Sequence, residues 1–442
     1  MFEKQNFPNE ALIILQTLKE KGYKCYFVGG CIRDLLLGIL PQEFDLATDA
    51  DPKTVASLFE KVIPTGIDFG TVTVLVNGKS FEITTFRKDE KYTDGRHPTS
   101  VIFSKDINED LSRRDFTVNA MAYDPETGAL IDNYNGQADI KHKIIKTVGN
   151  PETRFKEDGL RAMRACRFAA TLNFAIDEKT FSAISKTLNV VKKVALERVH
   201  DEIVKMLKAE KPSGGFEFMR KSGLLKLFIP ELENCVGVEQ PPNYHKYDVY
   251  WHNLYSCDAA PKDNLIVRLA ALLHDVAKPS CKVDLTFYNH DKAGVKMAEI
   301  ILKRLKFGNS GIKSVCNLIS NHMFDYKSEW SDSAVRRFMC RAGVENLPNL
   351  FALRVSDTKA MENEINVDYL KELQARIDKI IAEENALHIK DLKVDGKDIM
   401  KELAIAPGKK VGQLLEELLE KVIDDPKLND REKLLELIRK HA

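Results

Sequence analysis

The alternation of apolar and polar positions predicts strands in the first third of the chain. Short apolar runs rich in Val, Ile, Phe and Thr are bounded there by glycine, asparagine or charged residues, as strands are. Two of these runs are separated by Asn77-Gly78, a strong short signal for a tight hairpin. The runs lie at residues 23–28, 44–48, 71–76, 80–86 and 118–123.

Beyond about residue 140, the pattern changes to helical periodicity. Apolar residues recur every three to four positions, which places them on one face of a helix. We therefore expect an α+β fold, in which an α/β head is followed by an all-helical remainder. The helical segments are expected at residues 154–170, 197–209, 216–225, 264–277, 295–305, 411–422 and 432–439.

The composition excludes several classes of protein. The chain has 442 residues, of which 44% are hydrophobic and 30% charged, which is typical of a globular protein and not of a disordered or collagen-like one. No apolar run approaches a membrane span, and the first residues do not form a signal peptide. The eight cysteines form no C-x-x-C pair, which fits a reducing compartment. We expect a cytoplasmic protein without membrane contact, and leave open whether it is a monomer or a homodimer.

The charges balance over the whole chain but not locally. There are 66 basic and 66 acidic residues, so net charge does not indicate a nucleic-acid partner. Between residues 141 and 226, however, 19 basic residues stand against 10 acidic ones. This excess fits either a set of solvated helix faces or a surface that contacts a phosphate backbone.

Gly29-Gly30 connects a predicted strand to a predicted helix. Two glycines allow a phosphate to approach backbone N–H groups, and Arg33 can supply a bidentate phosphate contact. The alternative is a tight strand-to-helix connection without a ligand.

Acidic residues follow on the next predicted strands. Glu43 and Asp45 are two residues apart, so they share one face of a strand, where their charges repel unless a cation lies between them. Carboxylate oxygens suit Mg²⁺, and two such ions can clamp a triphosphate during phosphoryl or nucleotidyl transfer. Glu82 has apolar neighbours in another predicted strand, and is either a third carboxylate of this site or an exposed acid at a sheet edge.

These motifs resemble those of a known family. Gly29-Gly30-x-x-Arg33-Asp34 with the acid-x-Asp45 pair resembles motif A of the class II nucleotidyltransferases, which include the CCA-adding tRNA nucleotidyltransferases and the bacterial poly(A) polymerases. The segment 113–123 is similar to motif B, which contacts the ribose in that family, and residues 132–139 resemble the hinge motif C. The resemblance implies a polymerase-β-like head, Mg²⁺ as cofactor, and tRNA, ATP and CTP as partners. It assigns Arg113, Arg114, Asp115 and Asn119 to nucleotide binding.

Two further features bear on activity. The family usually has Asp where this chain has Glu43, which keeps the charge but adds a methylene group; activity either persists with adjusted metal geometry or is reduced. Residues 87–98 resemble the flexible loop that the family needs to switch from C to A addition, and their undiminished length favours complete CCA synthesis.

The segment Glu157-Asp158-Gly159-Leu160-Arg161 resembles motif D of the family. Asp158 and Arg161 are three residues apart and would share one helix face. An acceptor and a donor in this arrangement match the amino group and ring nitrogen that cytosine and adenine have in common, but not uracil or guanine. The alternative is an ordinary salt bridge between them. Arg164 and Arg167 continue the basic face toward triphosphate or RNA.

A second set of potential ligands lies in the helical part. His252, His274-Asp275 and Asp357 follow the order of ligands in HD-superfamily phosphohydrolases, which this region resembles. His290 and His322 could complete a two-metal site for Ni²⁺, Mn²⁺ or Fe²⁺ that activates water to attack a phosphoester. Alternatively, these side chains only pack within the helical body.

Four domains are predicted from these patterns: a catalytic head at 1–140, a neck for nucleotide templating and RNA binding at 141–225, a body with the HD-type site at 226–360 and a tRNA-binding tail at 361–442. The predicted function is addition of C, C and A to tRNA from CTP and ATP by two-metal nucleotidyl transfer. The alternatives are a poly(A) polymerase of the same family, or an HD phosphohydrolase whose nucleotidyltransferase head has drifted.

Overall fold

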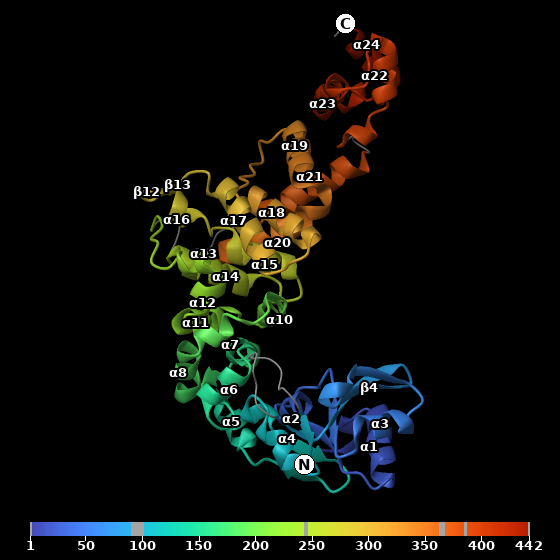
Figure 1. Ribbon diagram of the computed structural model, residues 1–442. Coiled ribbons are helices and arrows are strands. Elements are labelled where there is room, and N and C mark those ends of the chain that lie inside the picture. The colour runs from blue at the N-terminus through green and yellow to red at the C-terminus, as the bar shows by residue number, and fades with distance from the viewer. Residues whose placement is uncertain (1, 90–100, 243–245, 362–366, 384–386, 441–442) are drawn as a thin grey trace. The chain divides into compact units, whose positions relative to one another are not determined.

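The computed structural model divides the chain into two compact units. It describes residues 2–89, 101–242, 246–361, 367–383 and 387–440 (Figure 1). The first unit comprises residues 1–233 with 304–306, and the second comprises 234–303 with 307–442. The division into four domains stays a prediction within this coarser one.

A seven-stranded sheet forms the centre of the first unit's described residues (Figure 1). The strand order is β3-β4-β5-β2-β1-β8-β9, and β2 and β5 run parallel while the other neighbours are antiparallel. Parallel neighbours such as β2 and β5 require a crossover connection between them. Strands β3 and β4 lie within this connection along the chain. The strands are β1 (Cys25–Val28), β2 (Asp45–Thr48), β3 (Val62–Gly66), β4 (Thr71–Val76), β5 (Lys79–Thr85), β8 (Ala122–Asp124) and β9 (Ala129–Ile131).

Short elements surround the sheet. One core cluster joins Val28, Ala47 and Ala122 of the central strands to Phe86 and Leu111, so the head is held together by burial of apolar residues on the sheet face. The small ladder β6–β7 lies outside the main sheet. These elements are α1 (Asn9–Glu20), α2 (Gly30–Leu36), α3 (Pro52–Leu58), β6 (Arg87–Asp89), β7 (Val101–Phe103), α4 (Ile107–Ser112) and α5 (Gly136–His142).

The strand predicted at 118–123 is partly wrong. Thr117–Asn119 form a 3₁₀ turn, and only Ala122–Asp124 join the sheet as β8. A Cβ on Gly136 would lie 2.4 Å from the Thr117 carbonyl oxygen, so the start of α5 packs directly against this turn. Within this turn the Asn119 side chain is buried and hydrogen-bonds with Arg33 and Asp115, which the alternation of apolar residues does not reveal.

Helices follow the sheet to the end of the first unit (Figure 1). The helix predicted at 154–170 is interrupted at Asp158, whose backbone is extended, and Gly159 follows it where a Cβ would come within 3.0 Å of the Val191 backbone. The helix predicted at 216–225 ends early at Gly223, whose φ is +88°. The elements are β10 (Ile144–Ile145), α6 (Pro151–Glu157), α7 (Leu160–Leu172), β11 (Ala175–Ile176), α8 (Glu178–Lys186), α9 (Leu188–Val191), α10 (Leu196–Leu207), α11 (Ser213–Ser222), α12 (Leu224–Phe228) and α13 (Pro230–Glu233).

The second unit is helical apart from one two-stranded ladder in its described residues. Helices α14 and α20 pack along each other, and α15 and α18 lie beside them. The helix predicted at 264–277 ends at Leu273, so His274-Asp275 lie just beyond it. The elements are α14 (Val249–Ala259), α15 (Leu265–Leu273), α16 (Lys278–Cys281), β12 (Lys282–Val283), β13 (Thr286–Phe287), α17 (His290–Arg304), α18 (Asn309–Asn321), α19 (Asp332–Ala342), α20 (Leu347–Ala360) and α21 (Tyr369–Ala382).

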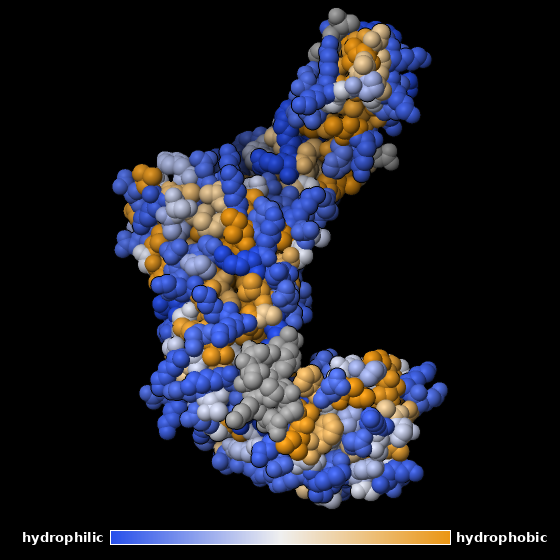
Figure 2. Space-filling model, in the orientation of Figure 1, coloured by the Kyte–Doolittle hydropathy of each residue, from blue (hydrophilic) through white to orange (hydrophobic). Residues whose placement is uncertain are grey.

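The C-terminal helices α22 (Gly396–Leu403), α23 (Lys409–Asp424) and α24 (Arg431–Arg439) bury a small apolar core of their own. Arg336 on α19 donates a hydrogen bond of 2.6 Å to the Ile423 carbonyl at the end of α23 and so ties these helices to the body. Hydrophilic residues cover most of the face drawn in Figure 2, with apolar atoms in small groups.

The predicted class is confirmed: an α/β head precedes a helical remainder, with only two-residue strands in the latter. Among the described helices, none has the length and apolar composition needed to cross a membrane.

Candidate active site and metal centre

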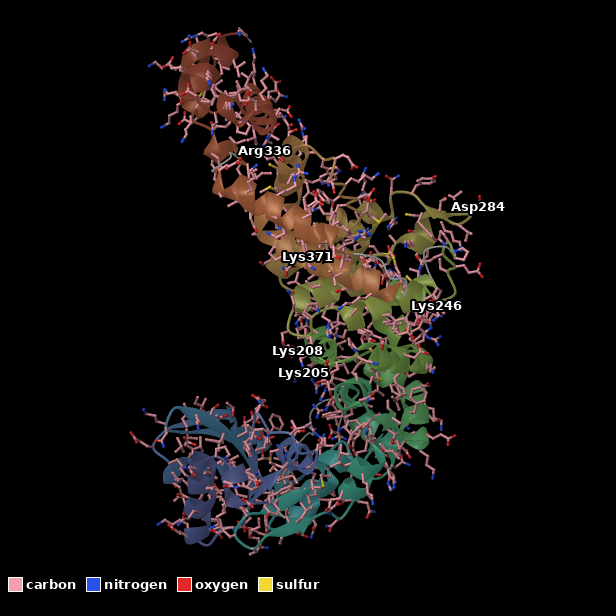
Figure 3. The ribbon with its side chains drawn as sticks, turned by 180° about the vertical axis from the view of Figure 1, so that it is seen from behind. Lys205, Lys208, Lys246, Asp284, Arg336 and Lys371 are labelled. Atoms are coloured by element: carbon pink, nitrogen blue, oxygen red, sulfur yellow. The ribbon has the colours of Figure 1, made fainter. Side chains whose placement is uncertain are left out.

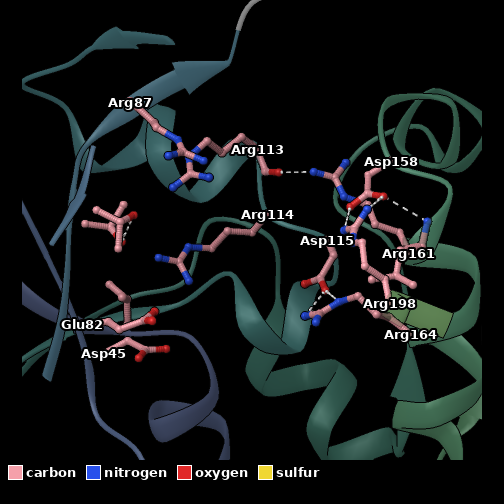
Figure 4. A pocket seen from close by; sticks show the side chains of 14 residues that line it. Asp45, Glu82, Arg87, Arg113, Arg114, Asp115, Asp158, Arg161, Arg164 and Arg198 are labelled. Atoms are coloured by element: carbon pink, nitrogen blue, oxygen red, sulfur yellow. Dashed lines mark hydrogen bonds and ion pairs between the residues drawn. The ribbon is translucent and has the colours of Figure 1, made fainter. Parts of the chain in front are cut away.

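A cavity of about 340 Å³ opens in the first unit between the sheet and the helices that follow it. Figure 4 shows acidic side chains from the sheet on one side and ionic pairs from α7 and α10 on the other, with three arginines between them. The labelled lining residues are Asp45, Glu82, Arg87, Arg113, Arg114, Asp115, Asp158, Arg161, Arg164 and Arg198.

Asp45 and Glu82 face the cavity from adjacent strands. Asp45 begins β2 and Glu82 lies in β5, and the pairing of Leu46 with Ile83 brings the two acids side by side (Figure 4). Burial raises the pKa of Asp45 to about 6, and the nearby carboxylates of Glu82 and Glu43 add to the rise. A carboxyl group whose ionised form is disfavoured in this way, beside two further acids, fits a divalent cation with hard oxygen ligands.

Glu43 does not lie on a strand, contrary to the prediction, because β2 begins only at Asp45. It is exposed in the preceding loop, close enough for its charge to raise the pKa of Asp45. Its side chain therefore remains near the candidate metal site, although it comes from a less constrained segment.

The glycine pair brings an arginine close to the backbone. Gly29 has a φ of +76°, and a Cβ there would lie 2.9 Å from Arg114 Nη1. The Gly29 amide donates to the Met121 carbonyl at 3.2 Å, so this predicted phosphate-binding group is already engaged within the fold. Gly30 begins α2, which carries Arg33.

Motif B and the preceding helix organise the central arginines. Asp110, fully buried in α4, accepts hydrogen bonds from Arg113 at 2.6 Å and from Arg114 at 3.1 Å. Although burial opposes it, these two guanidinium groups lower the pKa of Asp110. Sequence reasoning missed Asp110, although an acid three and four residues before two arginines is a helical ion-pair signal.

Asp115 and Asn119 connect the arginines of the two sides. Arg164 donates to Asp115 at 2.7 Å, Asn119 donates to Asp115 at 3.3 Å, and Arg33 donates to Asn119 at 2.7 Å. Burial alone would raise the pKa of Asp115, but the charges of Arg164 and Arg161 and its hydrogen bonds lower it to about 2. Hydrogen bonds thus join Arg33 of motif A to Asn119 and Asp115 of motif B and to Arg164 of α7.

Asp158 and Arg161 do not pair with each other, so the simple salt bridge between them is excluded. Asp158 accepts two hydrogen bonds from Arg198, at 2.8 and 3.1 Å, and Arg161 donates to Glu157 at 2.6 Å. Both side chains line the cavity (Figure 4). Arg198 and Glu157 therefore each hold one of the two predicted template residues, and sequence reasoning gave neither a site role.

Arg167 lies deeper in the same helix and donates to Glu202 of α10 at 2.9 Å. Glu202 is almost fully buried, so this pair belongs to the interior and not to the cavity wall. Lys205 and Lys208, farther along the chain, are exposed at the surface (Figure 3). The predicted loop at 87–98 extends beyond the described residues.

The six residues of the predicted HD-type site come together in the second unit. All are buried, and they come from α14, the end of α15, the start of α17, the end of α18 and α20. His252 Nε2 lies 3.2 Å from His274 Nε2 and 3.0 Å from Asp357 Oδ1. Asp275 Oδ1 lies 3.3 Å from His290 Nε2 and 3.8 Å from His322 Nε2.

The imidazole rings are oriented as metal ligands are. The rings of His274, His290 and His322 each place Nδ1 within 2.7–2.9 Å of a backbone carbonyl of the same turn, which directs Nε2 toward the carboxylates. Among the described residues, four buried atoms that meet there lack a hydrogen bond of good geometry. They are Asp275 Oδ1, Asp357 Oδ1, His290 Nε2 and His322 Nε2.

Two ligand groups of this cluster share one residue. His252, His274 and Asp275 form the first, and Asp275, His290 and His322 form the second, each with ligand atoms within 4.8 Å of one another. Despite burial, neighbouring cations hold the pKa of Asp275 well below its usual range, whereas burial and His274 lower the pKa of His322 to about 4. An ionised carboxylate shared by buried imidazoles fits a pair of divalent metal ions.

A cavity of about 440 Å³ adjoins this cluster. Lys278 and Arg354 line it, beside the apolar side chains of Phe287, Tyr288 and Met323. Lys278 also pairs with Asp275 at 2.6 Å, and so places a cation next to the candidate metal ligands.

Three family models match successive parts of the chain. The poly A polymerase head domain matches residues 25–146, the RNA and SrmB-binding site of polymerase A matches 173–236, and tRNA nucleotidyltransferase domain 2 matches 287–438.

Curated relatives and solved structures agree with these matches. The chain is 33% identical to a CCA-adding enzyme of Ligilactobacillus salivarius, over 99% of this chain and 98% of the relative, and 32% identical to one of Lactococcus lactis subsp. lactis, over 98% and 97%. It is also similar to the crystal structure of the Bacillus stearothermophilus CCA-adding enzyme in complex with CTP. The identity is 29%, the TM-score 0.77, and the coverage 98% of this chain and 96% of that one.

The Asp45 carboxyl should titrate near pH 6 in the folded protein and not near its ordinary 3.8. Because the folded state then binds a proton that the unfolded chain releases, Asp45 contributes stability at low pH that is lost as the pH rises from about 3.8 to 6. Mg²⁺ requires the ionised carboxylate, so its affinity should fall as the pH drops below about 6.

Carbon-detected NMR of the side-chain carboxyls, with and without Mg²⁺, measures this titration. Glu82→Gln should move the Asp45 midpoint downward, because one of the repelling charges is removed. Asp115, whose pKa is about 2, serves as an internal control that stays ionised throughout. A midpoint near 4 for Asp45 in the unaltered protein would contradict the repulsion described above.

Proposed function

Because the chain belongs to the family of CCA-adding enzymes, we propose that it adds C, C and A to the 3′ end of tRNA from CTP and ATP, with release of pyrophosphate. The observation that carries this proposal is the composition of one cavity. It combines acids suited to a divalent metal, arginines suited to a triphosphate, and an acid and an arginine suited to reading a base.

The carboxylates fit the metal chemistry of this reaction. Asp45 and Glu43, with Glu82 beside Asp45, would hold Mg²⁺; bound there, the ions neutralise charge on the triphosphate and activate the 3′-hydroxyl. The chain's own residues position the nucleotide. Arg113 and Arg114 present their charges toward the cavity from a buried Asp110, so they are oriented before the triphosphate arrives.

Base choice is assigned to Asp158 and Arg161. Asp158 would accept from the amino group of cytosine or adenine, and Arg161 would donate to the neighbouring ring nitrogen. Their separate partners, Arg198 and Glu157, keep acceptor and donor from neutralising each other. Uracil and guanine present the wrong groups, and leave a polar side chain unpaired.

A poly(A) polymerase of the same family would share the metal and phosphate residues. Two observations favour the CCA-adding enzyme: the curated relatives above carry that name over nearly the whole chain, and both template residues line the cavity. A head without catalytic function is disfavoured by the raised pKa of Asp45, because a drifted site would not be expected to retain repelling acids.

We also propose that the second unit binds two divalent metal ions and hydrolyses phosphoesters. The buried, unpartnered ligand atoms of Asp275, Asp357, His290 and His322, which meet from four places in the fold, carry this proposal. Ni²⁺, Mn²⁺ and Fe²⁺ suit the mixed imidazole and carboxylate ligands, and bound there they would lower the pKa of water to yield a nucleophile. Lys278 and Arg354 in the adjoining cavity can receive the phosphate.

The nucleotidyltransferase is tested with tRNA that lacks its 3′ end. Incubation with each labelled NTP, followed by sequencing of the product ends, should show C, C and A only.

Asp45→Ala should abolish addition while leaving thermal unfolding nearly unchanged, because a ligand is lost from a cavity wall and not from the core. Glu43→Asp should keep or raise activity. Addition of A alone, or full activity of Asp45→Ala, would contradict the proposal.

The template is tested by kcat/KM for all four NTPs. Asp158→Ala and Arg161→Ala should weaken discrimination against UTP and GTP by about 5- to 150-fold, because part of the base edge loses its partner at a cost of roughly 1–3 kcal/mol. Lys156→Ala, a change at an exposed position near the end of α6, should leave discrimination unaltered. If both template variants lose rate equally for every NTP, the pair does not read the base.

The second metal centre is tested by metal content. The purified protein should take up two equivalents of Mn²⁺ or Ni²⁺, and Asp275→Asn should lose most of both because it belongs to both ligand groups. His322→Ala should lose about one. Neither change should stop CCA addition, and Asp45→Ala should leave this metal content intact. Unchanged metal content in both HD-site variants would make the cluster structural.

A further inference from the structure

Phe168 on α7 lies among three guanidinium groups of the first unit. The Cζ atom of Arg167 lies 3.4 Å from the centre of its ring, and those of Arg33 and Arg164 each lie at 5.2 Å. All three distances are within the range of cation–π attraction. Arg164 and Arg167 share the helix of Phe168, but Arg33 belongs to α2 of the head.

Hydrogen bonds to acids and an amide hold these arginines around the ring. Arg33 donates to Asp34 at 2.8 Å, Arg164 to Asp115 at 2.7 Å and Arg167 to Glu202 at 2.9 Å. Each of the three guanidinium groups is thus paired with an acid, while all three lie near the ring of Phe168, where their like charges repel one another. Arg33 Nη1 also donates a hydrogen bond to Asn119, so Arg33 is linked to motif B as well.

The ring itself is fixed by packing. Phe168 is 5% exposed and meets the edge of Phe116 at a centroid distance of 5.7 Å. Phe116 follows Asp115 directly in the chain, so the segment that carries motif B supports the ring from the other side. A ring held in this way offers the cations a face whose direction is set in advance.

We propose that Phe168 is a positioning residue that sets Arg33 relative to the base-reading residue Arg161 on its own helix. The inference rests on the nucleotidyltransferase function proposed above and on the assignment of Arg33 to phosphate contact by its place in motif A. A bound nucleotide spans only a limited range of distances between its base and its phosphates, so both ends bind well only when α2 and α7 keep their spacing. Phe168 is an aromatic contact between these two helices.

An aromatic residue at this position also fills apolar space, and the test must separate the two effects. Stepwise fluorination of the ring, up to 3,4,5-trifluorophenylalanine at position 168, withdraws charge from its face with little change in volume. Phe168→Leu removes the face altogether. Phe174→Leu, at another buried aromatic residue just beyond α7, is the matched control for lost aromatic packing.

Equilibrium binding of CTP and of inorganic tripolyphosphate, measured by calorimetry, is the primary readout. Binding of both should weaken progressively with each fluorine, and by roughly 2- to 30-fold for the trifluoro ring. The loss should be similar for the two ligands, because Arg33 contacts phosphate and not the base. KM for CTP and ATP should rise in parallel while the preference for C and A over U and G persists. Phe174→Leu should bind like the unaltered protein.

Several results would overturn the proposal. Fluorinated proteins that bind like the unaltered one show that Phe168 acts only by its volume, even where Phe168→Leu is impaired or unfolded. A fall in kcat with unchanged binding of both ligands places the ring outside phosphate positioning. Failure of the unaltered protein to extend tRNA would contradict the proposed function instead, and the binding series still decides the role of the ring.

Discussion

The ion pair between Asp115 and Arg164 joins the two sides of the catalytic cavity. Asp115 lies in the segment between α4 and β8, and Arg164 lies on α7. Arg164 Nη2 is 2.6 Å from Asp115 Oδ2. Asp115 is buried and Arg164 is partly exposed, and the pKa of Asp115 falls to about 2 despite burial, so the charges persist at any physiological pH. Breaking the pair would leave the buried Asp115 carboxylate with its hydrogen bonds from Asn119 and the Phe116 amide but without its ion-pair partner, which is more costly than the pair is stabilising. Asn119 and Phe168 extend the contact to Arg33, so the motif B segment, α7 and α2 are linked through it.

The two candidate metal sites handle charge differently. In the head cavity, burial and the neighbouring acids together raise the pKa of Asp45, and a bound cation would favour its ionised form. In the second unit, the carboxylates lie among imidazoles and Lys278, so their pKa values are held low and the ligands stay ionised. The first site suits metal that arrives with a triphosphate and departs with pyrophosphate. The second suits metal that remains bound, since it is buried and its rings are fixed by backbone carbonyls.

The sequence predicted the chemistry of single residues better than their partners. Periodicity located strands β1, β2, β4, β5 and β8, at least in part, and seven helical segments, because these depend on local apolar spacing, but it did not predict β3 or β9. The six HD-type side chains were predicted from the resemblance to HD-superfamily phosphohydrolases. Periodicity also missed the break before α7, where Asp158 is extended, and the short 3₁₀ turn at Thr117, which packs against α5. The pairs Asp158–Arg198 and Arg167–Glu202 join residues more than thirty positions apart. No local pattern encodes such contacts, since they exist only after the helices pack.

Glu43, which stands where the family usually has Asp, lies in a loop that can accommodate the longer side chain. A strand fixes the direction of Asp45 and Glu82, and a longer side chain there would move its carboxylate relative to the neighbouring strand. Glu43 instead precedes β2 in an exposed loop, and among the charged groups that shift the pKa of Asp45 it ranks behind Glu82 and Arg114. A loop residue can absorb one methylene by a small change of backbone or rotamer, whereas a strand residue cannot. In the metal site proposed above, Glu43 would therefore approach Mg²⁺ from the loop, and Asp45 and Glu82 of the sheet would set the strict geometry.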